Sequence, residues 1–482
     1  MVSQSASDSA PDASAAPEGG AVLLRDRLAS GALDAERLVG SCLEHIANHE
    51  QNVQAWAWLD SDHALKQAKL RDTQLRAGHP IGSLHGLPVG VKDIIDTAGI
   101  PTENGTEADK GRVPTRDAFV VEQLKAAGAI VIGKTVTTEL AFMEPSKTRN
   151  PHNHQRSPGG SSSGSAAAVA SGMVPLAIGT QTGGSVIRPA AFCGVTGFKP
   201  SFGHVPRVGV LAQSQSLDTV GMFGRNVEDV ALLADALVGH HADDPASSPK
   251  PHQRLLETAR STPPMTPVFA FAKTPYWNMA TNEMQEALEE LAQVLGEQCF
   301  ETELPGAFAE ASSIRACINQ VEMAKNFHSY RRFDSDKLST VIREFMSEGD
   351  KVLAKDYLSA LDLPDVLNAG LHEVFERCDA ILTVAAPGSA PSLESTGDSV
   401  FNGIWTLCGN PAITLPLFSD TDGMPMGVQL VGRRGDDGRL LRTARWLEQH
   451  IASPRSLRGR NKSAARNPLS ADFSAYFRHL AS

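Results

Sequence analysis

The sequence offers no framework of paired cysteines. Its six cysteines are spread over 482 residues, and no two of them form a C-x-x-C pair. That spacing suits neither a structural zinc site nor a disulfide framework, so neither is expected to hold the fold. Cys193 and Cys408 stand in apolar surroundings and are expected to be core thiols.

Long apolar runs and a surplus of basic charge are also missing. No stretch approaches the ~20 apolar residues that a membrane-spanning helix needs. The formal net charge is -11, which argues against nucleic acid as a general partner. The N-terminus has neither a basic segment nor an apolar core of the signal-peptide kind. The sequence therefore predicts a cytoplasmic protein that binds neither nucleic acid nor membranes.

What is present is ordinary for a globular enzyme with a large core, since 41% of the residues are hydrophobic and 21% are charged. Residues 1–20 are mostly Ser, Ala, Pro, Asp and Gly and are predicted to be a disordered tail. One domain is expected over residues 21–455, with a strongly charged helical segment at 310–377. Residues 456–482 are expected to form a second tail.

Strand-like and helix-like segments alternate in the first third of the chain. Residues 87–91 and 129–133 are short apolar runs typical of buried strands, and residues 118–127 between them are expected to be helical. This order is typical of an α/β fold built around a sheet.

Residues 157–200 form the most informative block. Two clusters of small residues, 159–165 and 180–185, flank the apolar run 166–178. The run predicts a buried helix that ends near Gly172, followed by a short buried strand. Glycine and serine clusters allow backbone to approach a ligand closely, so the two loops are expected to face one pocket.

Other motifs in this part of the chain are weak. Residues 160–164 fit the G-x-S-x-G nucleophile elbow by letter, but loop residues precede them where that motif needs a strand. Residues 128–135 fit a phosphate loop by letter, but their four middle residues are apolar and favour a strand. His152 and His154 form an H-x-H pair without a third ligand nearby, so no metal site is expected.

The block at 157–200 resembles the amidase signature family, whose members carry a Gly/Ser-rich stretch that ends in G-G-S, an arginine and a proline. Residues 86–93 resemble the lysine segment of that family, and the resemblance extends over about residues 22–452. Further matching segments are 150–151, 156–160, 409–416 and 427–432. The resemblance implies a three-layer α/β/α sandwich around a large mixed sheet, with residues 310–377 as a variable helical cover over the pocket.

The same resemblance implies a Ser-Ser-Lys triad and no cofactor. Ser185 would be the nucleophile, Ser161 the bridging serine on a cis peptide, and Lys92 the base. A neutral lysine can replace the usual histidine if burial lowers its pKa, and here we expect apolar surroundings without a close carboxylate. Without the resemblance, Lys92 would be expected to reach water or to pair with Asp93 or Asp96.

Further site residues follow from the resemblance. Consecutive backbone amides would form the oxyanion hole, namely those of Thr182, Gly183, Gly184 and Ser185. Ser162 and Thr180 match positions that steady the triad by hydrogen bonds, although they could equally be ordinary loop hydroxyls.

Two departures from the commoner family form affect the pocket. Gln181 stands where an aspartate is usual, and the arginine is Arg188, three residues after the nucleophile, because Ile187 occupies the usual position. Arg188 therefore lacks its usual partner. It is expected to bind backbone carbonyls or a substrate carboxylate, and both Gln181 and Arg188 are candidates for substrate binding.

The residues and the resemblance together predict an amidohydrolase that cleaves an amide or carbamate C–N bond of a small molecule through a seryl acyl-enzyme. A homodimer is left open. The alternative is an amidotransferase A-type subunit, which hydrolyses glutamine within a tRNA-dependent complex. That branch carries a Gly-Tyr-Tyr-Asp segment, whereas residues 355–358 here read only Lys-Asp-Tyr-Leu.

Overall fold

The computed structural model describes residues 20–251 and 253–452. The two tails expected from the sequence lie outside these residues, apart from Gly20, which directly precedes the first helix. In the described part of the chain, no helix has the length and apolar character needed to cross a bilayer.

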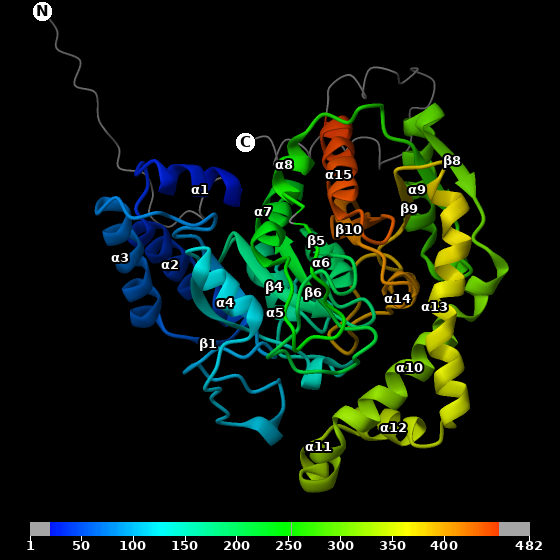
Figure 1. The fold of residues 1–482 in the computed structure, drawn as a ribbon, viewed down its shortest axis with the longest axis horizontal. Coiled ribbons are helices and arrows are strands. Elements are labelled where there is room, and N and C mark those ends of the chain that lie inside the picture. The colour runs from blue at the N-terminus through cyan, green and yellow to red at the C-terminus, as the bar shows by residue number, and fades with distance from the viewer. Residues whose placement is uncertain (1–19, 252, 453–482) are drawn as a thin grey trace, which may run out of the picture.

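One mixed sheet of eleven strands runs through the molecule in the order β1-β3-β2-β4-β6-β5-β10-β11-β9-β7-β8 (Figure 1). Strands β2, β3 and β4 are parallel neighbours, whereas β5, β6, β10 and β11 pair antiparallel. The large mixed sheet predicted from the sequence is thus confirmed. The strands are β1 (Trp56–Leu59), β2 (Pro88–Lys92), β3 (Ile130–Thr135), β4 (Leu176–Gln181), β5 (Thr196–Lys199), β6 (Thr219–Gly224), β7 (Phe269–Ala272), β8 (Cys299–Thr302), β9 (Ala380–Val384), β10 (Ala412–Ser419) and β11 (Pro425–Val431).

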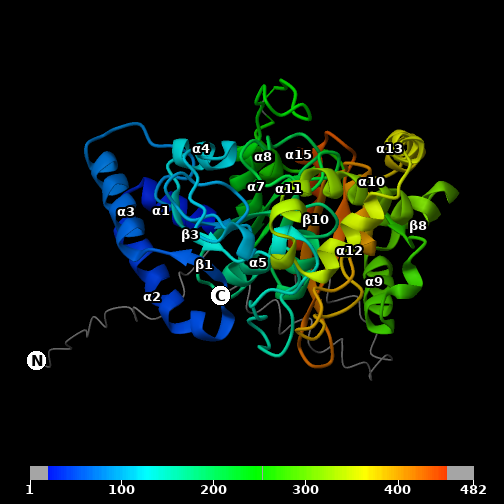
Figure 2. The same cartoon turned by 90° about the horizontal axis from the view of Figure 1, so that it is seen from below.

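Helices form the layers outside the sheet. Helices α5 and α6 pack together on the central strands, and so do α7 and α15, which gives the α/β/α arrangement. Helices α2 and α3 lie at the β1 end, and α9 and α13 lie at the β8 end (Figure 2). The helices are α1 (Ala21–Ala29), α2 (Ala35–Val53), α3 (Ser61–Arg76), α4 (Phe119–Ala126), α5 (Ser163–Ala170), α6 (Ile187–Cys193), α7 (Val227–Leu237), α8 (Leu255–Arg260), α9 (Asn282–Leu295), α10 (Ala311–Asn326), α11 (His328–Phe333), α12 (Thr340–Gly349), α13 (Ala354–Phe375), α14 (Val400–Leu407) and α15 (Asp437–Ala452).

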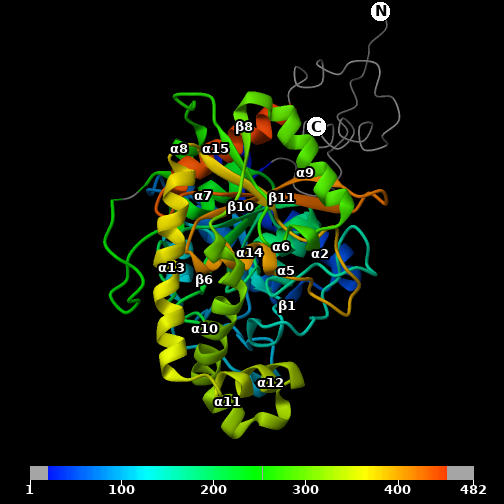
Figure 3. The same cartoon turned by 90° about the vertical axis from the view of Figure 1, so that its right-hand side faces the viewer.

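Helices α10 to α13 form a separate group, called here the helical cover. They follow one another in sequence and extend beyond the edge of the layered body (Figure 3). Helix α10 packs on α12 and α13 within the group and on α14 of the main body. The cover has its own apolar cluster, which includes Phe327, Ile342 and Met346 and extends to Leu140 and Phe142 of the main body. It is therefore joined to the rest of the molecule through α10 and through this apolar contact.

Helix α5 is held unusually close to its neighbours. A Cβ at Gly164 would lie 2.3 Å from the carbonyl oxygen of Ala55 and 2.4 Å from the amide nitrogen of Val136. Only glycine fits there, which explains one of the small residues in the 159–165 cluster. The chain leaves the helix through Gly172, which has a φ of 74°, and enters β4, as the sequence predicted.

Candidate active site

Three of the residues singled out in the sequence meet at one point because β2 and β4 are adjacent parallel strands. Lys92 is the last residue of β2, Thr180 lies on β4, and Ser161 precedes α5. The Lys92 Nζ donates hydrogen bonds to Ser161 Oγ at 2.7 Å and to Thr180 Oγ1 at 2.8 Å. The Gly160–Ser161 peptide bond is cis. Segments that are far apart in the sequence are thus joined by one amine.

The environment of Lys92 favours its neutral form. The side chain has no exposed surface, and this burial holds the pKa of the ammonium well below its usual value. The charge of Asp218 acts in the opposite direction and raises the pKa, but it is the smaller effect. Asp93, the neighbour in sequence, instead lies 3.5 Å from the Nζ of Lys134. A buried amine with hydroxyl partners can serve as a proton acceptor.

Ser162 supports this arrangement through the backbone of β4. Its hydroxyl donates to the carbonyl oxygen of Thr180 at 3.1 Å and accepts from the Thr180 amide at 3.2 Å. A Cβ at Gly179, the preceding residue of β4, would lie 2.5 Å from the Ser162 Oγ, so glycine is needed for this contact. Ser162 therefore fixes the strand that carries one of the two hydroxyls around Lys92.

Ser185 lies in the loop between β4 and α6 and is 9% exposed. Its hydroxyl has no hydrogen-bond partner among the described residues. The loop lines a cavity of about 350 Å³ that also contacts the helical cover. The lining residues are Ala141, Phe142, Met143, Thr182, Gly183, Gly184, Ser185, Arg188, Gln213, Arg315, Asn319, Phe345, Ser395, Gly397, Asp398 and Ser399. The proposed nucleophile and the oxyanion-hole residues thus face one cavity.

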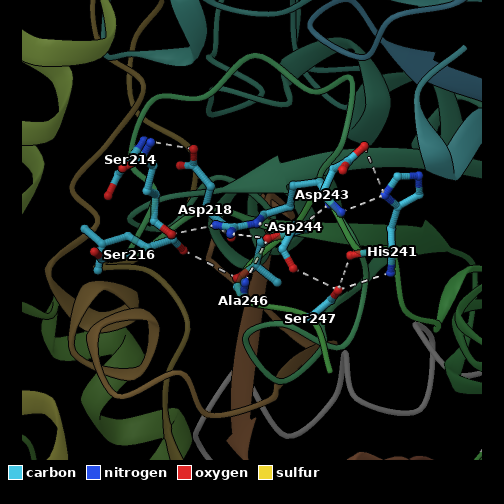
Figure 4. Close-up of polar contacts among 12 residues, drawn as sticks. Ser214, Ser216, Asp218, His241, Asp243, Asp244, Ala246 and Ser247 are labelled. Atoms are coloured by element: carbon cyan, nitrogen blue, oxygen red, sulfur yellow. Dashed lines mark hydrogen bonds and ion pairs between the residues drawn. The ribbon is translucent and has the colours of Figure 1, made fainter. Parts of the chain in front are cut away.

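Asp218 is a site residue that the sequence reasoning missed. It stands immediately before β6, is 7% exposed, and accepts a hydrogen bond from Thr182 Oγ1 at 2.6 Å. Its other oxygen accepts from the amides of Gln213 and Ser214 at 2.9 and 2.8 Å (Figure 4). Burial raises the pKa of this carboxyl to about 6. The expectation that no carboxylate lies close enough to influence Lys92 was therefore wrong.

We expect Asp218→Asn to shift the acid limb of the kcat/KM profile to lower pH. Removing the carboxylate charge removes the effect that favours protonated Lys92, so the lysine loses its proton at lower pH. Asp244→Asn is the matched control, because Asp244 is a second buried carboxylate nearby that pairs with Arg207 at 2.8 Å (Figure 4). An unchanged profile for Asp218→Asn, measured from neutral to alkaline pH, would show that Asp218 does not tune the lysine.

Gln181 has a role within the protein framework. Its Oε1 accepts from the amides of Val186 and Ile187 at 2.9 and 3.0 Å, and its Nε2 donates to Thr406 Oγ1 at 3.0 Å. The Thr406 hydroxyl in turn donates to the carbonyl oxygen of Gly183 at 2.7 Å. Gln181 does not line the cavity described above. The amide that replaces the usual aspartate thus spans the nucleophile loop and holds its two ends.

Arg188 lines the cavity and is 5% exposed. One terminal nitrogen donates to the carbonyl oxygen of Gly160 at 2.8 Å, whereas the Nε has no partner in the described part of the chain. Burial lowers the pKa of the guanidinium to about 10, with an opposing contribution from Asp398 and a further lowering by Arg315. The backbone thus satisfies only part of the hydrogen-bonding capacity of the Arg188 guanidinium, through a bond to the residue before Ser161.

The family resemblance placed a helical cover over the pocket but did not identify which of its residues reach the cavity. Arg315 and Asn319 of α10 and Phe345 of α12 line the cavity, as does Phe142 of the main body. The cover has no motif of small residues that would mark a site, so only the fold could place these side chains at the cavity.

Within residues 20–251 and 253–452, no group of three or more His, Cys, Asp or Glu side chains could hold a metal ion.

Comparison with known proteins identifies the family of the chain. The family model described as Amidase matches residues 37–441. The A-type subunit of the glutamyl-tRNA(Gln) amidotransferase from Symbiobacterium thermophilum is 34% identical over 477 residues, with 88% of this chain and 94% of the relative covered. Among solved structures, the peptide amidase of Stenotrophomonas maltophilia is 29% identical with a TM-score of 0.79, covering 90% of this chain and 97% of that one.

A second structural neighbour has a TM-score of 0.84 and is 26% identical, covering 90% of this chain and 98% of that chain. It comes from a protein complex described as vestigial, which reveals the evolutionary origins of an s-triazine catabolic enzyme. The family model covers well over half of this chain, and its residues include both the lysine segment and the Gly/Ser block. The chain therefore belongs to the amidase signature family.

Proposed function

We propose that the protein hydrolyses the C–N bond of a small-molecule amide or carbamate through an acyl-enzyme on Ser185. The observation that carries this proposal is the buried Lys92 amine, which lies 2.7 Å from Ser161 Oγ and has a depressed pKa. Serine becomes an effective nucleophile only when a base removes its proton, and a neutral lysine has the required basicity.

In the proposed mechanism, the Ser185 oxygen attacks the substrate carbonyl and its proton passes through the Ser161 hydroxyl to Lys92. The ammonium of Lys92 then returns this proton, along the same path, to the leaving amine as the C–N bond breaks. Water attacks the resulting ester with Lys92 again as the base, which releases the acid and restores Ser185. Each half of the reaction thus returns the lysine to its neutral state.

The oxyanion of each tetrahedral intermediate needs donors that are already in place. We propose that the backbone amides of Thr182, Gly183, Gly184 and Ser185 provide them. Two hydrogen bonds that fix this loop favour the assignment. The Thr182 hydroxyl donates to Asp218, and the Thr406 hydroxyl donates to the carbonyl oxygen of Gly183. Both keep the loop rigid, so that little reorganisation is needed when charge develops.

The alternative function is that of an amidotransferase component that hydrolyses glutamine for a partner. It is favoured by the 34% identity to the A-type subunit of a glutamyl-tRNA(Gln) amidotransferase over most of both chains. Both functions begin with the same attack of Ser185 on an amide carbonyl. They differ in the substrate and in the fate of the released amine.

A substrate panel distinguishes the two. The purified protein alone is incubated with glutamine and with primary amides, aryl amides, p-nitroanilides and carbamates, and released ammonia or amine is measured. Hydrolysis of small amides or carbamates at rates well above that of glutamine supports the amidohydrolase. Glutamine hydrolysis alone would favour the amidotransferase component instead.

A further inference from the structure

Helix α10 of the cover presents two polar side chains to the cavity. Arg315 and Asn319 are four residues apart, so they lie on the same face of the helix, and both line the cavity. Arg315 has no hydrogen-bond or ion-pair partner among the described residues. Asn319 is 4% exposed, and its Oδ1 is likewise without a partner there. A buried polar atom normally has a partner, so the Asn319 Oδ1 is available to a ligand, and the partly buried Arg315 guanidinium lies on the same face of the helix.

Glycines on two other elements make room for the Arg315 guanidinium. A Cβ at Gly183 would lie 3.2 Å from a terminal nitrogen of Arg315, and a Cβ at Gly403 of α14 would lie 2.5 Å from its Nε. The cation therefore lies against the nucleophile loop and against α14. This position is beside the loop that carries Ser185.

The cavity has more positive than negative charge in its lining. Arg188 and Arg315 are both lining residues, and their charges repel, since Arg315 lowers the pKa of Arg188. The only carboxylate among the lining residues is Asp398, which forms no ion pair with either arginine in the described structure, although its charge raises the pKa of both and for Arg188 outweighs the effect of Arg315. One of its oxygens accepts from the Val400 amide at 2.9 Å. The lining thus has two cationic groups for one carboxylate, and an anion in the cavity would balance the second positive charge.

The polar face of α10 is fixed in place by Glu322 at the end of the same helix. Glu322 is 2% exposed and accepts hydrogen bonds from the hydroxyls of Ser216 at 2.5 Å and Tyr357 at 2.9 Å, and from the Ser214 hydroxyl. These bonds join α10 to α13 and to the loop that carries Asp218. Arg315 and Asn319 are thus presented by a helix whose rotation is restrained.

We propose that Arg315, with Asn319 beside it, forms a subsite for a carboxylate on the acyl part of the substrate, so that the enzyme prefers half-amides of simple dicarboxylic acids to uncharged amides and to glutamine. Arg315 binds the carboxylate with two parallel N–H donors, whereas the Asn319 Oδ1 accepts from an N–H group of the substrate. Phe142 and Phe345, whose ring centroids lie 4.6 Å apart, provide apolar contact for the methylenes between carboxylate and amide. This inference rests on the proposed amide hydrolysis, and it concerns the acyl group alone.

The test measures binding in a background that leaves the ligand intact. With Ser185→Ala as the parent, isothermal titration calorimetry is run with malonamate, succinamate and glutaramate, and with butyramide as the uncharged comparison. We expect at least one of the three acids to bind more tightly than butyramide. Adding Arg315→Gln should weaken the binding of that acid by about 10- to 100-fold, and Arg315→Lys should weaken its binding less. Butyramide binding should stay unchanged.

Lys325→Gln is the matched control, because it removes one positive charge from the same helix at an exposed position. Lys325 donates to Gln215 Oε1 at 2.9 Å and does not line the cavity, so its replacement should leave acid binding unchanged. Equal affinity for the acids and for butyramide in the parent would overturn the inference, as would equal weakening of both ligands by Arg315→Gln with an unchanged melting temperature. A failure of catalysis in the wild type, with selective acid binding retained, would contradict the proposed function and leave the subsite standing.

Discussion

Replacing Ser185 by alanine is expected to lower kcat by about 10⁴-fold or more with the substrate found active in the panel. The hydroxyl is the proposed nucleophile, so its removal leaves no group at this position to form the acyl-enzyme. The melting temperature should change little, because the Ser185 hydroxyl has no hydrogen-bond partner within the described residues. The measurement is steady-state turnover beside thermal unfolding.

The double variant Ser185→Ala/Lys92→Ala provides an internal control. Groups that act as one catalytic unit are strongly non-additive, so the double variant should be little slower than Ser185→Ala alone. If Ser185→Ala kept a tenth of wild-type turnover, the nucleophile would have to be another residue.

Replacing Lys92 by methionine is expected to have a comparably large effect, and the pH dependence of the wild type should explain it. Only neutral Lys92 can accept the serine proton. Because burial lowers the lysine pKa, kcat/KM should rise with pH through an ionisation below the usual value of about 10.4 and then level off. The profile is measured from neutral to strongly alkaline pH.

Methionine keeps much of the volume of the lysine side chain but cannot accept a proton. The Lys92→Met variant should therefore remain folded. The kcat/KM of its residual activity should no longer rise with pH through the lysine ionisation. If Lys92→Met retained the same ionisation, that limb would belong to another group and Lys92 would not be the base.

The residues alone predicted the local elements of the site, whereas the approach of Lys92 to Ser161 was implied by the resemblance to the family. The Gly/Ser block encodes its own helix and strand, and the parallel pairing of β2 with β4 then brings Lys92 to Ser161 and Thr180. Small residues are required where backbones nearly touch, as at Gly164, and such requirements leave a recognisable pattern in the sequence. The alternation of strand-like and helix-like segments predicted an α/β fold, and the large mixed sheet was implied by the resemblance.

Asp218, Arg315 and Asn319 could not be predicted in the same way. Asp218 reaches the site through hydrogen bonds to Thr182 and to two amides of a loop without regular structure, and no periodicity marks such contacts. Arg315 and Asn319 stand on an amphipathic helix, where an arginine and an asparagine ordinarily indicate a solvated face. Their contact with the cavity depends on how the cover packs against α14, which is a tertiary property.

Gln181 shows a different limit of sequence reasoning. Its departure from the usual aspartate suggested a change in the pocket, but the side chain spans the nucleophile loop and does not line the cavity. An amide can accept from two backbone amides and donate to Thr406 at once, whereas a carboxylate could only accept. The substitution therefore changes how the loop is held.

The central claim is that Ser185 becomes acylated, and mass spectrometry of a trapped intermediate tests it most directly. The protein is quenched with acid during turnover of a slow carbamate or aryl ester, digested, and its peptides are sequenced by fragmentation. The account predicts an acyl adduct on Ser185 in the wild type and its absence in Ser185→Ala. An adduct on Ser161, on a cysteine or on any other residue, with Ser185 unmodified, would contradict it.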